Sequence, residues 1–143
     1  MLFRSYKKTK HKVILTGDDS LDVISAPGAL SQVFTNLVMN SLKHGFEGIE
    51  QGTVTIDVHR GENGVEIVYS DNGVGMTSEV VQKIYDPFFT TKRGMGGSGL
   101  GMNIVYNLVT RILGGDIRCE SSPGNGAKFY INLPWEIDKS SHI

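Results

Sequence analysis

Residues 71–76 read Asp-Asn-Gly-Val-Gly-Met, and they directly follow an alternating run in which Val65, Ile67 and Tyr69 share one side. Such alternation predicts a half-buried β-strand, so the hexapeptide is a loop at the strand's end. A carboxylate there can accept a hydrogen bond from an exocyclic amine, and the two glycines let the backbone approach a flat ring closely. A plain Asp-Asn-Gly turn is the alternative interpretation.

The segments on either side of this strand extend the pattern. Thr53 to His59 alternates in the same way, and the turn residues 61–64 join it to the strand, which predicts an antiparallel hairpin. After the hexapeptide, Thr77 can cap a short helix that runs to Ile84. Residues 86–98 have the composition of a long loop.

Two long helices are predicted. The first follows Pro27, which suits a first helical turn, and runs from Gly28 to His44. The second begins near Gly99 and is stopped by Gly114 and Gly115. Helical spacing of apolar residues predicts a buried face on each: Leu30, Val33, Phe34, Leu37 and Ser41 on the first, and Ile104, Val105, Leu108 and Ile112 on the second.

Further short strands complete the chain. Lys12 to Thr16 and Leu21 to Ser25 resemble a hairpin, and Asp116 to Ser121 and Ala127 to Leu133 are strands joined by a glycine-containing turn. Together these elements predict an α+β fold, a two-layer sandwich in which helices cover one face of a mixed, mostly antiparallel sheet.

The chain is expected to hold one domain with short ends. We expect residues 1–10 to be a frayed start or the stump of a preceding helical segment, 11–135 the domain, and 136–143 a loose tail.

Composition limits the function. The chain has 143 residues, enough for one domain, and its formal charge of −1 with a pI of about 6.4 gives no basic excess for binding nucleic acid. Cys119 is the only cysteine, which agrees with a reducing compartment. Nothing in the sequence resembles a signal peptide or membrane span. We therefore expect a cytoplasmic domain without direct membrane contact, whose longer parent protein can still be membrane-anchored.

A strip of polar residues borders the apolar face of the first helix. Asn36, Asn40, Lys43 and His44 share this strip, which places them at the edge where the helix meets the sheet. An amide oxygen suits Mg²⁺, which commonly bridges protein and phosphate oxygens, and Lys43 and His44 lie one turn further on, where they can meet those phosphates. A solvated polar face is the alternative.

A glycine-rich run, Gly94-Met95-Gly96-Gly97-Ser98-Gly99-Leu100-Gly101, leads into the second helix. Exposed backbone amides at a helix start form an anion site; a flexible loop at a helix boundary is the alternative. The run also fits the dinucleotide pattern G-x-G-x-x-G, but residues 86–92 before it are no strand, and the Walker pattern is absent. We expect residues 93–98 to be mobile without nucleotide.

Pro87-Phe88-Phe89-Thr90-Thr91-Lys92 precedes this run. Two adjacent phenylalanines before a glycine-rich loop resemble an anchor for a mobile lid. We expect at least one of the two rings to pack in the core.

Taken in order, these four elements resemble the N, G1, F and G2 boxes of the catalytic domain of histidine kinases. The resemblance covers the chain from about Pro27 to Pro134. It implies the ATP-binding fold that histidine kinases share with gyrase, the mismatch-repair ATPase and the heat-shock chaperone ATPase, known as the GHKL or Bergerat fold. It also implies a protein histidine kinase that uses ATP and Mg²⁺.

The resemblance assigns roles to individual residues. Asn40 would hold Mg²⁺, Asn36 and Lys43 would be catalytic, and Asp71 would read the adenine amino group. The implied ATP-binding residues are Asn36, Asn40, Lys43, His44, Asp71, Gly73, Gly75, Met76, Phe89, Thr90, Thr91, Lys92, Gly97, Ser98, Gly99, Leu100 and Gly101.

Two positions refine the comparison. Hydrolytic relatives carry a glutamate at the position of Asn36, and an amide cannot act as a general base, so phosphotransfer is favoured over hydrolysis. Relatives often have a threonine where Ala127 stands, and its hydroxyl supports the adenine-binding aspartate through water, so that one contact is missing here.

The phosphoacceptor histidine of the family lies on a separate helical hairpin. His11, His44, His59 and His142 do not resemble it. The expected partners are therefore the dimerisation and phosphoacceptor domain of a parent kinase and, indirectly, a response regulator. A serine kinase of the anti-sigma-factor type and a nucleotide-binding module without transfer activity are the alternatives.

Overall fold

The computed structural model describes residues 2–3, 10–17, 26–89 and 101–135. The elements in chain order are β1 (Leu2–Phe3), β2 (Lys12–Gly17), α1 (Pro27–Asn40), η1 (Ser41–Gly45), β3 (Thr53–Arg60), β4 (Gly64–Asp71), α2 (Ser78–Lys83), α3 (Gly101–Asn107), η2 (Leu108–Ile112), β5 (Asp116–Ser121) and β6 (Ala127–Pro134). The segments η1 and η2 are single π-helical turns that continue α1 and α3.

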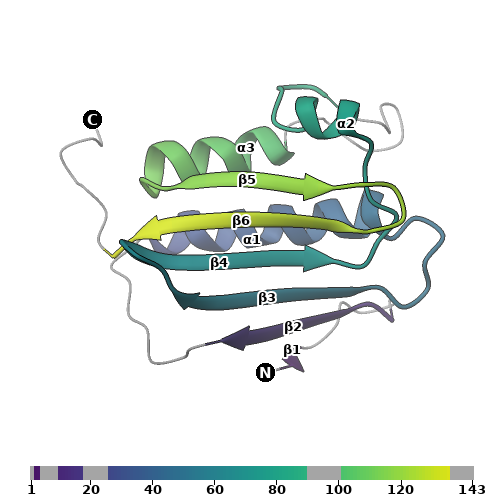
Figure 1. Ribbon diagram of the computed structural model, residues 1–143, viewed down its shortest axis with the longest axis horizontal. Coiled ribbons are helices and arrows are strands. Elements are labelled where there is room, and N and C mark those ends of the chain that lie inside the picture. Colours follow the sequence, from purple (N-terminus) through teal and green to yellow (C-terminus); the bar gives the residue numbers. More distant parts are fainter. Residues whose placement is uncertain (1, 4–9, 18–25, 90–100, 136–143) are drawn as a thin grey trace.

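The strands form one six-stranded sheet in the order β1-β2-β3-β4-β6-β5 (Figure 1). Among these strands only β2 and β3 pair in parallel. The predicted hairpin is β3–β4, in which Ile56 lies opposite Tyr69 and Val58 opposite Ile67. The expectation of a mixed, mostly antiparallel sheet is confirmed.

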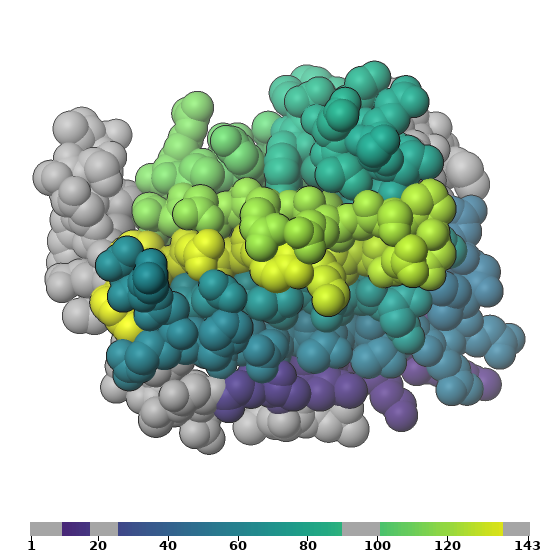
Figure 2. All heavy atoms as spheres, viewed as in Figure 1, coloured from purple at the N-terminus to yellow at the C-terminus, as the bar shows by residue number. Residues whose placement is uncertain are grey.

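Helices α1 and α3 both lie on one face of the sheet, and the core lies between them and the strands (Figure 1). Figure 2 shows the other face, where no helix covers the side chains of β3, β4, β6 and β5. The predicted two-layer arrangement is confirmed. Within the described part of the chain, every helix is too short or too polar to cross a membrane.

The first helix matches its predicted span and buried face, but its last turn differs. The α-helix predicted to reach His44 ends at Asn40, and residues 41–45 form a π turn closed by the Phe46 N–H, which donates to Ser41 O at 2.8 Å. The wider turn changes the direction of the side chains that follow Asn40. Ser41, predicted on the apolar face, is 1% exposed.

The predicted buried face of the second helix is partly wrong. Val105 is buried as expected, but Ile104 and Ile112 are 39% and 37% exposed, and Val109 and Leu113 are buried instead. The turn from residue 108 to 112 is π-helical, so extrapolating an α-helical period misplaces Ile112.

The N-terminal strands also differ from expectation. At Val13 and Ile14, β2 is bordered by β1 on one side and β3 on the other. The second arm of the predicted hairpin, residues 21–25, lies outside the described residues. Leu2–Phe3 is a strand, so the expectation of a helical stump is wrong for these two residues.

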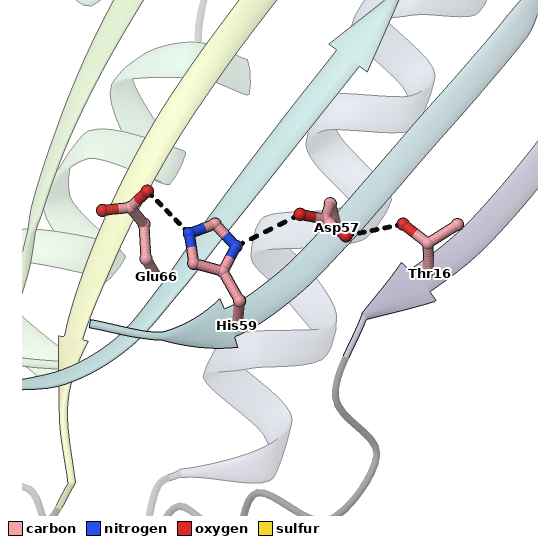
Figure 3. A network of polar contacts seen from close by, with 4 residues as sticks. All are labelled: Thr16, Asp57, His59 and Glu66. Carbon is pink, nitrogen blue, oxygen red and sulfur yellow. Dashed lines mark hydrogen bonds and ion pairs between the residues drawn. The ribbon is translucent and has the colours of Figure 1, made fainter.

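A polar network lies on the open face of the sheet (Figure 3). His59 Nδ1 lies 3.1 Å from Asp57 Oδ2 and its Nε2 2.9 Å from Glu66 Oε1, while Thr16 donates to Asp57 Oδ1 at 2.7 Å. Partial desolvation lowers the pKa of His59, but hydrogen bonds to Glu66 and Asp57 and their charges outweigh it, so the pKa lies above its usual value. The two carboxylates therefore favour the protonated form of the imidazole.

This network predicts a pH-dependent contribution to stability. Because the folded pKa of His59 exceeds the unfolded value, the contribution is complete below about pH 6.5 and is lost as pH rises through the raised folded pKa. The stability deficit of His59→Gln in urea titrations should therefore be larger at about pH 6 than at about pH 8.5. The imidazole titration followed by NMR should shift downward in Glu66→Gln. A deficit that grows with pH would contradict the network.

Candidate functional site

A cavity of about 560 Å³ lies at one end of the sheet, between the helices and the loop that follows β4. Residues far apart in the sequence line it: Asn36, Met39, Asn40, Lys43, His44, Gly45, Glu47, Asp71, Val74, Gly75, Met76, Thr77, Val80, Ile84, Phe89, Gly101, Met102, Ile104 and Ala127. Its polar residues come mainly from α1, η1 and the end of β4.

The predicted polar strip forms one side of the cavity. Asn36 and Asn40 on α1 and His44 on η1 are half-buried, whereas Lys43 is exposed. Lys43 and His44 lie on the π turn that continues α1 and line the same cavity as Asn40, and single π turns are often found at functional sites.

Asn36 lines the cavity and leaves one hydrogen-bond donor unpaired among the described residues. Its Oδ1 accepts a hydrogen bond from Gln32 Nε2 at 3.2 Å, and its buried Nδ2 has no partner among the described residues. A buried amide hydrogen without an acceptor is costly, by about 1–3 kcal/mol. An anionic ligand oxygen would supply the missing acceptor, so this geometry suits Asn36 to bind phosphate rather than metal.

Asp71 ends β4 and is 8% exposed, and three groups hold its carboxylate. The backbone N–H groups of Gly73 and Ala127 donate to Oδ1 at 3.0 and 3.1 Å. The Ser41 hydroxyl donates to Oδ2 at 2.7 Å. The carboxylate therefore has a fixed orientation, set by the loop after β4, by β6 and by η1.

The loop 72–76 is fastened on both sides by backbone hydrogen bonds. Val74 N donates to Gly45 O at 2.7 Å on the helix side. On the strand side, Gly124 N donates to Val74 O at 2.7 Å and Gly126 N to Gly73 O at 3.1 Å. These bonds draw the end of η1 and the β5–β6 turn together around the loop.

Glycines are required for this close approach. A Cβ on Gly73 would lie 2.2 Å from Gly45 O, and one on Gly75 would lie 2.0 Å from Ser122 O. Gly75 also has φ +77°, which side chains other than glycine rarely adopt. The two glycines of the hexapeptide therefore let the loop pack closely against Gly45 on one side and Ser122 on the other.

Apolar side chains form the remaining walls. Met76, Ile84 and Met102 are buried or half-buried there, and the more exposed Met39, Val74 and Ile104 also line the cavity. Three of the large exposed apolar side chains thus gather around one opening that ends in a buried carboxylate. A flat, apolar ring with a polar edge fits these walls.

Most of the predicted ATP-binding residues meet at this cavity. Gly73 belongs to the loop after β4 but does not line the cavity. Those that line the cavity are Asn36, Asn40, Lys43, His44, Asp71, Gly75, Met76, Phe89 and Gly101. Thr90, Thr91, Lys92, Gly97, Ser98, Gly99 and Leu100, and with them the predicted mobile segment 93–98, lie outside the described residues.

Some residues of the site were missed or misplaced by sequence reasoning. Ser41 was predicted to be buried but was given no role, although a serine within an apolar helix face is a recognisable signal. The expectation that a phenylalanine of residues 87–92 packs in the core is wrong. Phe88 is 59% exposed with φ 65°, and Phe89 is half-buried at the cavity.

The three histidines in the described ranges lie in three different surroundings. His11 lies just before β2, where its Nδ1 accepts a hydrogen bond from Gly52 N at 2.7 Å and its ring stacks on Phe46. His59 is part of the network on the open sheet face. His44 lines the cavity, and His142 lies outside the described residues.

The donor set determines what kind of metal site is feasible. Within the described ranges, no group of three or more His, Cys, Asp or Glu side chains comes together as a metal site. Asn40 offers one amide oxygen at the cavity. That fits Mg²⁺ held jointly by a protein oxygen, water and phosphate oxygens, as is usual for nucleotide-bound Mg²⁺.

Comparison with known proteins gives consistent matches. The model of the family described as "Histidine kinase-, DNA gyrase B-, and HSP90-like ATPase" matches residues 25–137. The sensor histidine kinase ZraS of Klebsiella oxytoca is 40% identical over 109 residues, which cover 76% of this chain and 22% of that protein. The chain thus spans about a quarter or less of the length of the curated relatives it matches.

Solved structures agree with the sequence comparison. The nucleotide-free catalytic domain of the histidine kinase ThkA superposes with a TM-score of 0.77 at 28% identity, covering 92% of this chain and 84% of that one. Full-length ShkA in complex with AMPPNP gives a TM-score of 0.72 at 26% identity over 87% of this chain and 25% of that one. The fold is that of histidine-kinase catalytic domains.

The packing of the loop predicts unequal effects of two alanine substitutions. Gly75 and Gly124 both have positive φ, but only a Cβ at Gly75 would clash, since nothing lies within 4 Å of one at Gly124. Gly124→Ala should lower the free energy of unfolding by about 1–2 kcal/mol through backbone strain. Gly75→Ala should lower it by about 1–3 kcal/mol more. Equal losses in urea titrations would show that the close approach is not what requires glycine.

Proposed function

The chain belongs to the histidine kinase-, DNA gyrase B- and HSP90-like ATPase family, and on this basis we propose that it binds ATP with Mg²⁺ and presents the γ-phosphate to a histidine on a separate domain. The observation that supports this most is the shared cavity. It combines a buried, oriented carboxylate at Asp71 with the amides of Asn36 and Asn40 and the charge of Lys43.

Asp71 is the proposed reader of the base. As a carboxylate it can only accept hydrogen bonds, and adenine carries an amino donor at its edge where guanine carries a carbonyl. The apolar walls that include Met76, Ile84 and Met102 suit the faces of the ring.

The α1–η1 side is the proposed phosphate end. Lys43 would neutralise phosphate charge, Asn36 Nδ2 would donate to a phosphate oxygen, and Asn40 would bind Mg²⁺ through its amide oxygen. Bound Mg²⁺ would reduce the repulsion between the phosphate oxygens and the incoming nucleophile. Because phosphoryl transfer depends mainly on positioning and electrostatics, these residues need not abstract a proton.

Transfer is proposed to a histidine outside this chain. An imidazole nitrogen of the acceptor forms a bond to the γ-phosphorus while the bond to the bridging oxygen breaks, and ADP leaves. Asn36 cannot act as a general base toward water, which favours this transfer over hydrolysis. The proposal places the domain in the cytoplasm as part of a sensor kinase, with a phosphoacceptor domain as its direct partner and a response regulator as an indirect one.

Transfer can be measured by mixing the chain with a separately made acceptor hairpin and labelled ATP. We expect an acid-labile phosphohistidine on the hairpin, and no product with Asn40→Ala, which removes the proposed Mg²⁺ ligand. Acid-stable phosphoserine on another target would indicate the serine-kinase alternative. ATP binding without any product would indicate a binding module.

Base selection gives a second prediction. ATP should bind at least about tenfold more tightly than GTP. In GTP the guanine carbonyl would face the Asp71 carboxylate, and two acceptors in a desolvated pocket cannot form a hydrogen bond. Asp71→Ala should remove most of this preference and weaken ATP binding itself, as measured by competition titration. Asp116→Ala is the matched control. Asp116 is an exposed aspartate at the start of β5 and does not line the cavity. Undiminished preference in Asp71→Ala would remove Asp71 from the base site.

A further inference from the structure

The carboxylate of Asp71 has one acceptor position left. A carboxylate offers about four lone-pair positions on its two oxygens. The N–H groups of Gly73 and Ala127 occupy both positions of Oδ1, and the Ser41 hydroxyl occupies one of Oδ2. A ligand donor must therefore approach Oδ2, the same oxygen that Ser41 contacts.

The direction of the hydrogen bonds in this cluster follows from the number of hydrogens. Ser41 Oγ lies 2.7 Å from Asp71 Oδ2 and 2.7 Å from the Tyr69 hydroxyl. An ionised carboxylate has no hydrogen to give, so Ser41 donates to it and has none left for Tyr69. Tyr69 must then be the donor toward Ser41, and it shares its hydrogen with Leu37 O at 3.0 Å.

The two hydroxyl groups are rigidly held. Tyr69 is 0% and Ser41 1% exposed, and the Tyr69 ring packs edge-on against Phe129 with ring centres 6.1 Å apart. Ser41 is the first residue of the π turn, directly after Asn40. The chain Tyr69–Ser41–Asp71 therefore links the helix that carries the proposed phosphate end to the strand that carries the base reader.

We propose that Ser41 and Tyr69 are positioning residues for base recognition: Tyr69 orients the Ser41 hydroxyl, which holds Asp71 so that the remaining lone pair of Oδ2 faces the amino group of adenine. This inference rests on the proposed function. Ala127 on β6 contributes only its backbone N–H to the carboxylate. Ser41 supplies a hydroxyl to the same carboxylate from the helix side.

The expected effect is a loss of dependence on the amino group. Without the Ser41 hydroxyl, the carboxylate is held through Oδ1 alone, so the direction of the Oδ2 lone pairs is less closely fixed. Hydrogen bonds weaken steeply when their angle is poor. Ser41→Ala should therefore reduce the ratio of ATP affinity to that of a purine nucleoside triphosphate lacking the amino group by about five- to tenfold. Tyr69→Phe should give a smaller reduction, because Ser41 keeps its own hydrogen bond to Asp71.

The experiment titrates both nucleotides against wild type, Ser41→Ala, Tyr69→Phe and Ser70→Ala, with thermal unfolding as a check of folding. Ser70 is the matched serine control, since it lies on β4 beside Asp71 but faces away from the core. The proposal requires a reduced affinity ratio in both hydroxyl variants and an unchanged ratio in Ser70→Ala.

The other outcomes are informative. Equal weakening of both nucleotides, with an unchanged ratio, would reduce Ser41 to a structural residue and overturn the proposal. If Ser41→Ala does not fold, Tyr69→Phe decides in the same way. A wild-type chain that binds both nucleotides equally would instead contradict the proposed role of Asp71. A wild-type preference lost in Asp71→Ala but kept in Ser41→Ala would contradict this inference alone.

Discussion

The hydrogen bonds to the Asp71 carboxylate are the interaction on which the rest of the site depends. This buried carboxylate accepts hydrogen bonds from the loop after β4, from β6 and from η1. Removing any one donor would leave a buried anion partly unsatisfied, which is costly in a desolvated site. The requirement to satisfy this carboxylate therefore fixes how the helix layer meets the sheet at the end where the cavity opens.

Glycine backbone packing maintains the same arrangement. Gly73 and Gly75 let the loop approach Gly45 and Ser122 so closely that any Cβ would clash. Lys43 and His44 of η1 line the same cavity as Asp71. The proposed base site and the proposed phosphate site thus share one packing arrangement, in a chain that belongs to the ATPase family.

Much of this was predictable from sequence because it depends on local patterns. Alternation identified β3 and β4, and the glycines around residue 73 identified the loop. The π turns were not predictable, because a π-helical turn leaves no distinct residue period, and they account for the misplaced Ile112. Ser41 was assigned to the correct face, but its partner Tyr69 is 28 residues away, and only the fold brings their hydroxyl groups together.

The most direct test is a crystal structure of the chain with Mg²⁺ and a non-hydrolysable ATP analogue. The account predicts the adenine amino nitrogen at about 3 Å from Asp71 Oδ2, with the Ser41 hydroxyl still donating to that oxygen. It also predicts the phosphates beside Asn36, Asn40 and Lys43. A base bound elsewhere in the cavity, or an amino group on Oδ1 with Ser41 displaced, would contradict the account.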